Sequence, residues 1–451
     1  MRGTRTLTTA TRTTTTRTTR LAFVRFGVLN KNMNKQPLTV FVSGTYLVLI
    51  GLISMTAQIE LAELFQAYAD CRKDKRNTMN ALAFEVDYEN NLLKLCAEIN
   101  NGTYQPGRSV AFIVTKPVTR EIFAADFRDR VVHHLVINKL NPLFEREFIY
   151  DSYACRLGRG TSFGIKRLDS FIRRCSQNYS QDCYILKLDI AGFFMHIDQD
   201  ILLAKLTRFM QQKYTAADCG LLLDLCKKII YNNATKNCVI KSERCAWNNL
   251  PTNKSLFYSA YHCGLPIGNL TSQIFANFYM NILDHFVKSD LGVRFYGRYV
   301  DDCVLVHQDK KYLKSLAAKI RAFLSLHLKL TLHPRKIYLQ HYTKGVKFLG
   351  VVLKTGRTYI ANRTKGNFYQ AIVKQNIIVT QRKPLTAELI AFLCSMNSYL
   401  GLMQQCSSYR IRQQIVLQKL ATQWWNYVFL SADSAKFIVR NKGSVANIIK
   451  G

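Results

Sequence analysis

Two aspartates, Asp301 and Asp302, stand side by side inside the apolar, β-prone stretch RYVDDCVLVH, residues 298–307. Branched and aromatic residues predict a strand on either side of them, so the chain is expected to turn at the aspartates. Asp-Asp suits a two-residue turn poorly, because such turns favour Asn-Gly or Gly-Gly. Two like charges about 4 Å apart also repel by roughly 1 kcal/mol in water, and by more near a buried site. The stretch is compatible with a polar hairpin tip or with half of a cation site.

A third aspartate, Asp189, lies in another β-type stretch, CYILKLDIAGFFMHID at residues 183–198. Carboxylates from two strands offer hard oxygen ligands, which suit Mg²⁺ bound together with substrate phosphates. Two such ions about 3.5–4 Å apart can activate an attacking hydroxyl and stabilise the leaving oxygen in phosphoryl transfer. Taken alone, Asp189 is also compatible with a helix cap or an ordinary surface position.

The charge of the chain indicates a polyanionic partner. Lys and Arg number 63 against 29 Asp and Glu, which gives a net charge of +34, and +26 without the basic first 54 residues. With aromatic residues at 12% of the chain, this excess favours nucleic acid. The sequence contains neither a GxxxxGK[ST] nor a GxGxxG loop, which argues against P-loop and dinucleotide-binding enzymes.

The thirteen cysteines lack the spacing of a typical zinc site. The closest pairs, Cys219/Cys226 and Cys238/Cys245, are seven residues apart, whereas zinc ligands usually pair at two to four residues. We therefore expect reduced thiols in a cytoplasmic protein.

Residues 1–54 differ in composition from the rest of the chain. The first twenty are mostly Thr and Arg, and the uncharged stretch from Leu38 to Ala57 is about long enough to span a bilayer. A membrane anchor, a targeting segment and a non-native extension from an upstream start codon all remain open. We favour the extension, because Met33 and Met55 offer later starts and the periodic sequence begins just after Met55.

The remaining pattern predicts an α+β protein. Residues 58–102 predict two amphipathic helices, residues 104–130 short strands that lead into a helix, and residues 205–262 a polar helical insertion. Hairpins are expected over residues 293–307 and 345–361, with a helix at about 311–327 between them. From about residue 366 the chain is expected to be helical, basic and aromatic.

Taken together, the motifs resemble those of reverse transcriptases. KLDIAGFFMHID, GLPIGNLTSQ, RYVDDCVLVH, HPRKIYLQ and GVKFLGVVL follow the order of the palm motifs, and REIFAADFRDRVVHH and SYACRLGRGT resemble fingers motifs of the bacterial group. The resemblance runs from about residue 60 to 430. It implies a right-hand polymerase with fingers at 55–182, an RRM-like antiparallel palm at 183–362 and a helical thumb with a basic tail at 363–451.

The resemblance also implies a catalytic site for RNA-directed DNA synthesis. Asp189 and Asp301 would bind two Mg²⁺ ions, with Mn²⁺ as an alternative, and the Ile190 carbonyl would be a further ligand. Asp302 would bind or orient the same ions. Lys336 would assist the leaving pyrophosphate.

The same resemblance assigns residues to the incoming dNTP. Arg128 and Arg130 would bind the triphosphate, and Phe194 would exclude ribonucleotides at the 2′ position. The residues expected beside the new base pair are Ile267, Gly268 and Gln273. Without the motifs, these residues are compatible with solvated helix charges, a core Phe, and turn or cap positions.

The second palm motif points to a subgroup. Most reverse transcriptases have Gln-Gly-x-x-x-Ser-Pro there, whereas this chain has IGNLTSQ, with Ile267 in place of Gln and Gln273 in place of Pro. That variant resembles the enzymes of diversity-generating retroelements, although Phe163 and Gly164 depart from their usual pattern. The resemblance implies error-prone copying of a template-repeat RNA at adenines, extension of a cDNA primer, and a small basic accessory protein. Retron, group II intron-like and phage-defence reverse transcriptases remain alternatives, as does a catalytically silent RNA-binding scaffold.

Overall fold

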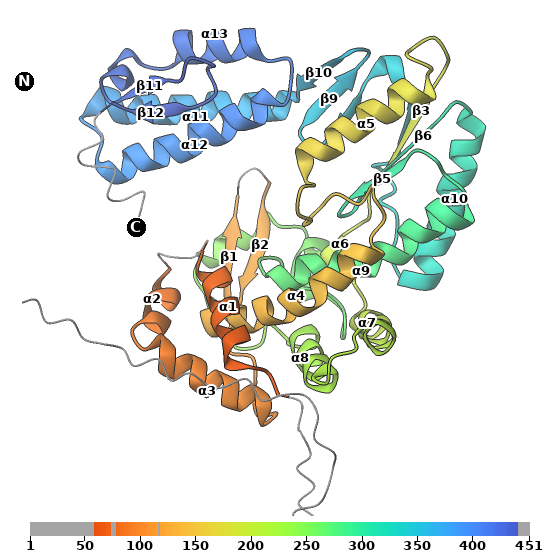
Figure 1. Ribbon diagram of the computed structural model, residues 1–451. Coiled ribbons are helices and arrows are strands. Elements are labelled where there is room, and N and C mark those ends of the chain that lie inside the picture. The colour runs from red at the N-terminus through yellow and green to blue at the C-terminus, as the bar shows by residue number, and fades with distance from the viewer. Residues whose placement is uncertain (1–57, 74–77, 116–117, 441–451) are drawn as a thin grey trace, which may run out of the picture. The chain divides into compact units, whose positions relative to one another are not determined.

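The computed structural model describes residues 58–73, 78–115 and 118–440 (Figure 1). The Thr/Arg-rich tract and the apolar stretch before residue 58 lie outside these residues, so the predictions for them stay untested. The described residues belong to one compact unit, Thr56–Gly451. Among the described helices, none combines the length and the apolar composition needed to cross a bilayer.

The N-terminal region combines helices with a small sheet. The helices are α1 (Leu61–Arg72), α2 (Met79–Glu85), α3 (Tyr88–Asn100) and α4 (Phe127–Glu147). The prediction of two helices over residues 58–102 was wrong. The described residues of this range form three helices, because a short turn follows α2 and Asp87 is the N-cap of the separate helix α3. The short strands expected at residues 104–130 are β1 (Val110–Val114) and β2 (Arg120–Ala124), which pair antiparallel, and β4 (Val239–Ile240) joins β1 in parallel.

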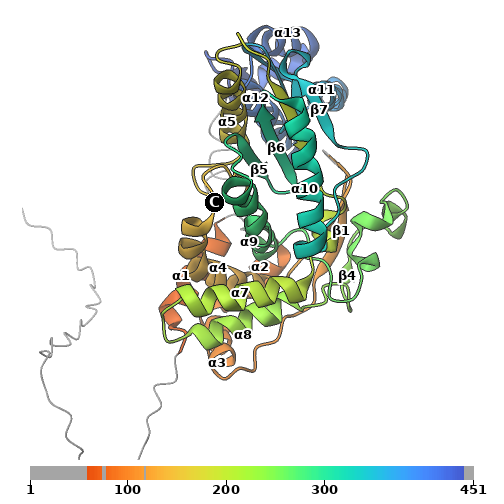
Figure 2. The same ribbon diagram turned by 90° about the vertical axis from the view of Figure 1, so that its right-hand side faces the viewer.

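The central sheet has the antiparallel order β5-β6-β3-β7. Its strands are β3 (Tyr184–Leu188), β5 (Tyr296–Tyr299), β6 (Asp302–His307) and β7 (Tyr338–His341). Leu186 and Leu305 face a core built with α9 (Leu270–His285) and α10 (Lys310–Leu328), whereas Ile185 and Val304 face α5 (Thr161–Cys175). Helices cover both faces of the sheet (Figures 1 and 2), and the two central strands, β3 and β6, are accordingly largely apolar.

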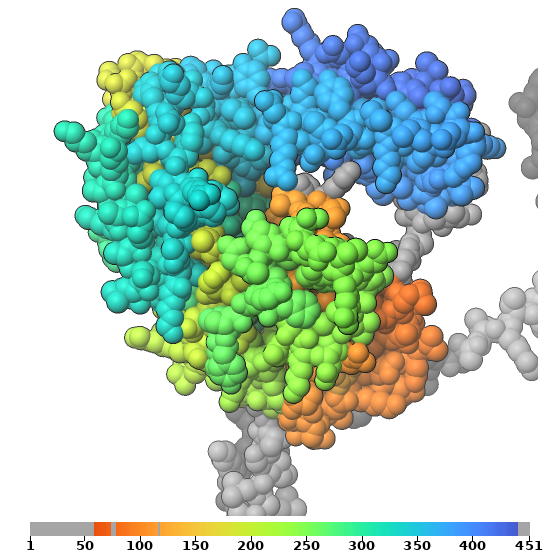
Figure 3. Space-filling model, turned by 180° about the vertical axis from the view of Figure 1, so that it is seen from behind, coloured from red at the N-terminus to blue at the C-terminus, as the bar shows by residue number. Residues whose placement is uncertain are grey.

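The region between β3 and β5 is less helical than predicted. After α6 (Phe193–His196), the helices α7 (Gln199–Lys213) and α8 (Cys219–Ile230) end before the expected boundary at residue 262. Residues 231–264 are instead short 3₁₀ turns and loops around β4, and they form surface next to the N-terminal helices (Figure 3). Glu121 holds this segment on β2, because its carboxylate accepts hydrogen bonds from Trp247 Nε1, Ser255 Oγ and the Leu256 amide at 2.6–2.8 Å.

The C-terminal region begins with a sheet of order β10-β9-β8 and continues with helices. The strands are β8 (Val346–Phe348), β9 (Val351–Lys354) and β10 (Arg357–Ile360), and the helices are α11 (Asn362–Gln381), α12 (Thr386–Gln404) and α13 (Tyr409–Lys419). The expectation of a wholly helical tail was wrong. The segment WWNYVF forms a 3₁₀ turn followed by β11 (Val428–Leu430), which pairs with β12 (Phe437–Val439). The turn carries the buried Trp424, which stacks on Phe392 at 4.0 Å between ring centroids.

Candidate active site

The pairing of β3 with β6 brings the predicted carboxylates to one end of the central sheet. Leu188 pairs with Cys303, so Asp189 leaves β3 beside Asp302, the first residue of β6. Tyr299 pairs with Asp302, which places the hairpin turn at Val300 and Asp301 rather than at the two aspartates. The sequence-based prediction of an Asp-Asp turn was therefore one residue out of place.

The turn carries its strain at Val300. This residue has a φ of +56°, a left-handed conformation that is unfavourable for a β-branched side chain. Asp301, the next residue, does not have a positive φ, and it is half-buried. A strained turn of this kind persists only where the surrounding contacts hold it.

Each of the two flanking aspartates has a lysine partner. Lys336 Nζ lies 2.9 Å from Asp189 Oδ1, and Lys187 Nζ lies 3.0 Å from Asp302 Oδ1. Burial, together with the negative charges of Asp302 and Asp189, raises the pKa of the Asp301 carboxyl to about 6, and Lys336 opposes the rise. The three carboxylates are therefore close enough to repel one another.

The donor set suits a hard cation, although the described residues contain no ready-made cluster of three or more His, Cys, Asp or Glu around one point. One carboxylate oxygen of Asp189 and one of Asp302 each lie beside a lysine ammonium group, which supplies positive charge next to the carboxylates. Burial and the charges of Asp302 and Asp189 together raise the pKa of Asp301, so added positive charge would be favourable at this place. Carboxylate oxygens with excess negative charge are the ligands that Mg²⁺ prefers, so the residues present fit such an ion. The thirteen cysteines, all within the described residues, are free thiols.

Ile190 is held at the next position along the chain from Asp189. Its side chain is buried, and it bridges Leu332 in an antiparallel arrangement. The bridge is made by neighbours: the His333 amide donates to the Asp189 carbonyl at 2.7 Å, and the Ala191 amide donates to the Thr331 carbonyl at 2.9 Å. Because the neighbours of Ile190 make both hydrogen bonds, the amide and carbonyl of Ile190 itself point away from the segment that contains Leu332.

Phe194 connects the carboxylate end of β3 to the second palm motif. Its half-buried ring meets Phe193 edge to face at 5.3 Å, and its carbonyl accepts a hydrogen bond from the Leu265 amide at 2.8 Å. Gly192, just before these two rings, has a left-handed backbone, and a Cβ there would lie 2.6 Å from the Asn253 carbonyl, so no side chain fits at this position.

The segment Ile267–Asn269 is locked onto β2. The Phe123 amide donates to the Ile267 carbonyl at 2.8 Å, and the Ala125 amide donates to Asn269 Oδ1 at 3.0 Å. Gly268 has a φ of +124°, and a Cβ there would lie 2.7 Å from Ile122 Cγ2. Glycine is therefore required for this close approach.

Gln273 lies in the first turn of α9 and is exposed. Its Oε1 accepts a hydrogen bond from the Cys155 thiol at 3.0 Å, so the motif also contacts the segment SYACRLGRGT. The structure thus places Gln273 and the fingers-like segment on a common surface.

The predicted triphosphate ligands have other partners in this conformation. Arg128 pairs with Glu98 and lies over the Tyr104 ring at 5.1 Å, while Arg130 Nε donates to the Ala125 carbonyl at 2.9 Å. Burial lowers the pKa of both guanidinium groups. Their described contacts lie within the N-terminal region and do not include the three aspartates.

Arg120 and Lys187 belong to the neighbourhood of the site, and sequence reasoning missed both. Arg120 is exposed at the start of β2, and its charge opposes the rise that burial causes in the pKa of Tyr299, the residue before the turn. Alternation in REIFA predicts that Arg120 points outward, but it does not show what Arg120 faces. The pairing of Lys187 with Asp302 depends on the sheet register.

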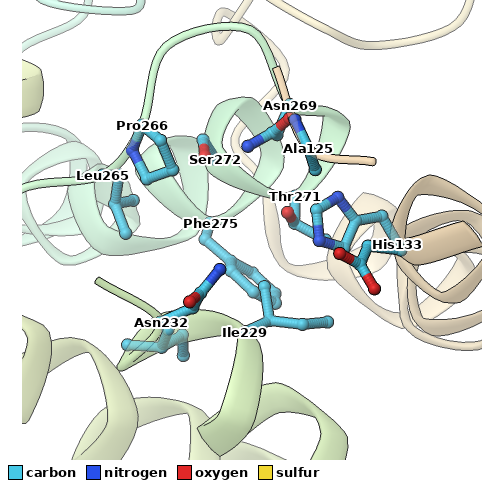
Figure 4. Close-up of a pocket in the computed structure, with 12 residues that line it drawn as sticks. Ala125, His133, Ile229, Asn232, Leu265, Pro266, Asn269, Thr271, Ser272 and Phe275 are labelled. Atoms are coloured by element: carbon cyan, nitrogen blue, oxygen red, sulfur yellow. The ribbon is translucent and has the colours of Figure 1, made fainter. Parts of the chain in front are cut away.

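A pocket lies behind the start of α9 (Figure 4). Its lining includes Asn269, Thr271 and Ser272 from the second palm motif, together with His133 and Asp129 from α4. Burial lowers the pKa of His133 to about 3, so the ring is neutral at physiological pH. Among the described residues, no group forms a hydrogen bond with His133 Nδ1.

Comparison with known proteins identifies the class. Residues 116–353, more than half of the chain, match the family described as reverse transcriptase (RNA-dependent DNA polymerase). The chain belongs to this family, and it is an RNA-directed DNA polymerase. No curated protein matches it.

Solved structures similar to the chain include yeast telomerases. Apo telomerase from Candida tropicalis is 13% identical, with a TM-score of 0.44, over 69% of this chain and 56% of that one. Telomerase from Candida albicans, in complex with a TWJ fragment of telomeric RNA, is 12% identical, with a TM-score of 0.41, over 71% of this chain and 58% of that one. The chain thus spans less than two thirds of these telomerases.

Proposed function

We propose that this polymerase copies a template RNA into cDNA at a site formed by Asp189, Asp301 and Asp302. The observation that carries the proposal is the convergence of these carboxylates at adjacent ends of β3 and β6, with a raised pKa at Asp301. In this assignment residues 55–182 are the fingers, 183–362 the palm and 363–451 the thumb and basic tail, and the enzyme works in the cytoplasm.

Asp189, Asp301 and the Ile190 carbonyl would hold two divalent ions, Mg²⁺ or Mn²⁺, and Asp302 would keep the site oriented through Lys187. Such ions would lower the pKa of the primer 3′-hydroxyl and neutralise charge on the phosphates. Lys336 contributes a positive charge at Asp189 that is available to the leaving pyrophosphate.

The incoming dNTP would lie between Phe194 and the segment Ile267–Gly268. Phe194 would exclude a 2′-hydroxyl, and Gly268 would allow the backbone to approach the base pair, with Gln273 beneath it. Arg128 and Arg130 remain candidates for the triphosphate, but each would have to exchange its present partner for phosphate oxygens. Arg120 requires no such exchange, and we add it to the candidates.

The finer proposal is that the enzyme belongs to a diversity-generating retroelement and acts with a small basic accessory protein. Ile267 supports it, because an apolar branched side chain offers no hydrogen bond to the nascent base pair. Replacing Ile267 with Gln is expected to reduce misincorporation opposite template adenines several-fold, as measured by sequencing the cDNA. Unchanged misincorporation would contradict this proposal, and the Ile267→Val variant is the matched control.

A retron, group II intron-like or phage-defence role would share the catalytic site but not the adenine errors. A genomic observation separates them: a near-duplicate repeat pair beside the gene, differing at template adenines, is expected only for the retroelement.

The catalytic assignment is tested by primer extension on an RNA template with Mg²⁺. Asp301→Asn is expected to lower the rate by about 10³-fold or more, because it removes an ionic ligand from the site where charge develops. Asp290→Asn, which removes an exposed carboxylate just after α9, is the control and should remain active. Equal activity of the two variants would refute the role of Asp301, whereas no primer extension by the wild-type protein would favour a silent RNA-binding scaffold.

A further inference from the structure

Arg298 is a fully buried arginine next to the turn that carries Asp301. It belongs to β5, and both its side chain and that of Asp284 on α9 are 0% exposed. Nε lies 2.8 Å from Asp284 Oδ1, and Nη2 lies 2.6 Å from Asp284 Oδ2, which is a two-pronged contact. The geometry fixes the plane of the guanidinium group.

The remaining donors of Arg298 reach a second residue of α9 and two other segments. Nη1 donates to the Val300 carbonyl at 2.9 Å and to Asn277 Oδ1 at 3.2 Å, and Nη2 donates to Ser152 Oγ at 3.3 Å. An arginine has five N–H donors, so this group has an acceptor for each of them. The charge is therefore satisfied in the core, and its position is over-determined.

The backbone of Arg298 is held as well. Its amide donates to the Asp151 carbonyl, and its carbonyl accepts from the Tyr153 amide, both at 2.9 Å. Arg298 thus joins α9, the segment after α4 and the turn that carries Asp301. A buried ion pair is often no more stabilising than an apolar contact of similar size, so specificity of geometry is the benefit to test here.

We propose that Arg298 is a positioning residue for the polymerase reaction. By binding the Val300 carbonyl, it holds Val300 in its left-handed conformation and so aims the Asp301 carboxylate at Asp189 and Asp302. Asp284 acts through Arg298 by fixing the guanidinium plane. The inference rests on the proposed role of Asp301 and adds the device that orients it.

The test compares Arg298→Lys with Tyr296→Phe. Lysine keeps the charge but cannot bind both Asp284 and the Val300 carbonyl, because its ammonium group has no planar fork. Tyr296 donates to the same Asp284 Oδ1 at 2.7 Å from the same strand, and its described contacts do not reach the turn. Tyr296→Phe therefore perturbs the buried pair of Arg298 and Asp284 while leaving the hydrogen bond from Arg298 to the Val300 carbonyl in place.

For Arg298→Lys we expect a fall in kcat of about 10- to 100-fold with the KM for dNTP within about twofold, because a misplacement near 1 Å has that effect on rate. Binding of Mn²⁺ to the protein alone, followed by electron paramagnetic resonance, is expected to weaken about tenfold. Tyr296→Phe should leave both quantities near wild type. All assays are run below the midpoint of thermal unfolding of each variant.

A folded Arg298→Lys variant with wild-type kcat and Mn²⁺ affinity would overturn the proposal, as would equal losses in Tyr296→Phe. If Arg298→Lys does not fold, Asp284→Asn tests the same point, since it weakens the two-pronged contact that fixes the guanidinium plane at nearly the same side-chain volume. Wild-type kcat and Mn²⁺ affinity in a folded Asp284→Asn variant would then refute it. Wild-type behaviour of Asp301→Asn would instead refute the assignment of the site itself.

Discussion

The ammonium group of Lys336 lies 2.9 Å from Oδ1 of Asp189, although 147 residues separate them in sequence. The contact gives Asp189 a positive partner at the end of β3, where Asp301 and Asp302 supply only negative charge. The lysine therefore compensates part of the repulsion that makes this place suitable for a cation.

Replacing Lys336 with Met is expected to slow primer extension by about 10- to 100-fold, because a charge-assisted hydrogen bond to a carboxylate is lost. Single-turnover kinetics on an RNA template measure the effect. Arg335→Met, which removes one positive charge from the adjacent exposed residue, is the control and should change the rate little. Equal slowing in both variants would indicate a general loss of charge rather than a specific contact.

Replacing the exposed Arg120 and replacing the paired Arg128 should have different effects on the KM for dNTP and on the melting temperature. Arg120→Ala is expected to raise the KM for dNTP by about tenfold, since an exposed guanidinium group is available to phosphate oxygens. Arg128→Ala should chiefly lower the melting temperature, because Arg128 pairs with Glu98 and lies over Tyr104. A larger rise in KM for the Arg128 variant would reverse the assignment.

Phe194 should determine the choice of sugar. Phe194→Ala is expected to reduce discrimination against ribonucleotides by about 10- to 100-fold, because removing the ring opens space for a 2′-hydroxyl. The ratio of kcat/KM for dNTP and rNTP gives the measurement. Phe194→Tyr keeps the ring and should retain discrimination; if the alanine variant retains it too, Phe194 is a core residue only.

Gly268 should tolerate no side chain. Gly268→Ala is expected to destabilise the fold by about 1–3 kcal/mol and to lower activity, because its Cβ would lie 2.7 Å from Ile122 Cγ2 in a left-handed backbone. Thermal and urea unfolding measure the loss. The control is Gly292→Ala, where φ is +63° but no neighbour lies within 4 Å, so that only backbone strain is added. Similar losses would show that the contact with β2 is unimportant.

His133 should make stability depend on pH. Its folded pKa, about 3, lies below the usual value of 6.5, so the unfolded chain binds the extra proton between these limits. The histidine's contribution is complete above about pH 6.5 and decreases as the pH falls, by up to about 1.4 kcal/mol per pH unit.

The test is urea unfolding of wild type and His133→Gln between pH 4.5 and 7.5. The variant is expected to have a flatter profile, while His134→Gln should retain the wild-type slope. Three other charged or titratable groups face His133: Asp129, which lines the same pocket, and Arg130 and His134, which add positive charge. Asp129 and Arg130 are present in both wild type and His133→Gln, and the His134→Gln variant controls for His134. Parallel profiles for wild type and His133→Gln would show that the ring is not held neutral.

The local elements of the fold were largely predictable. Apolar and branched residues around Asp189 and Asp302 predicted strands that the structure contains, and the expected helix at 311–327 is α10. Errors occurred where local pattern is weak. Residues 231–264 looked helical but depend on the contact between Glu121 and Trp247, and the aromatic tail segment depends on burial of Trp424.

The sequence by itself determined the strands around the three aspartates, the helix that follows them and the motifs of a reverse transcriptase, because strong strand and helix patterns and motif residues are local properties. Tertiary structure alone decided that the turn falls at Val300 and Asp301, since this follows from the register of β5 with β6. It also decided the partners of Asp189 and Asp302 and the burial of Arg298 against Asp284. Those contacts join residues from different elements, and only packing and register bring such residues within hydrogen-bonding distance.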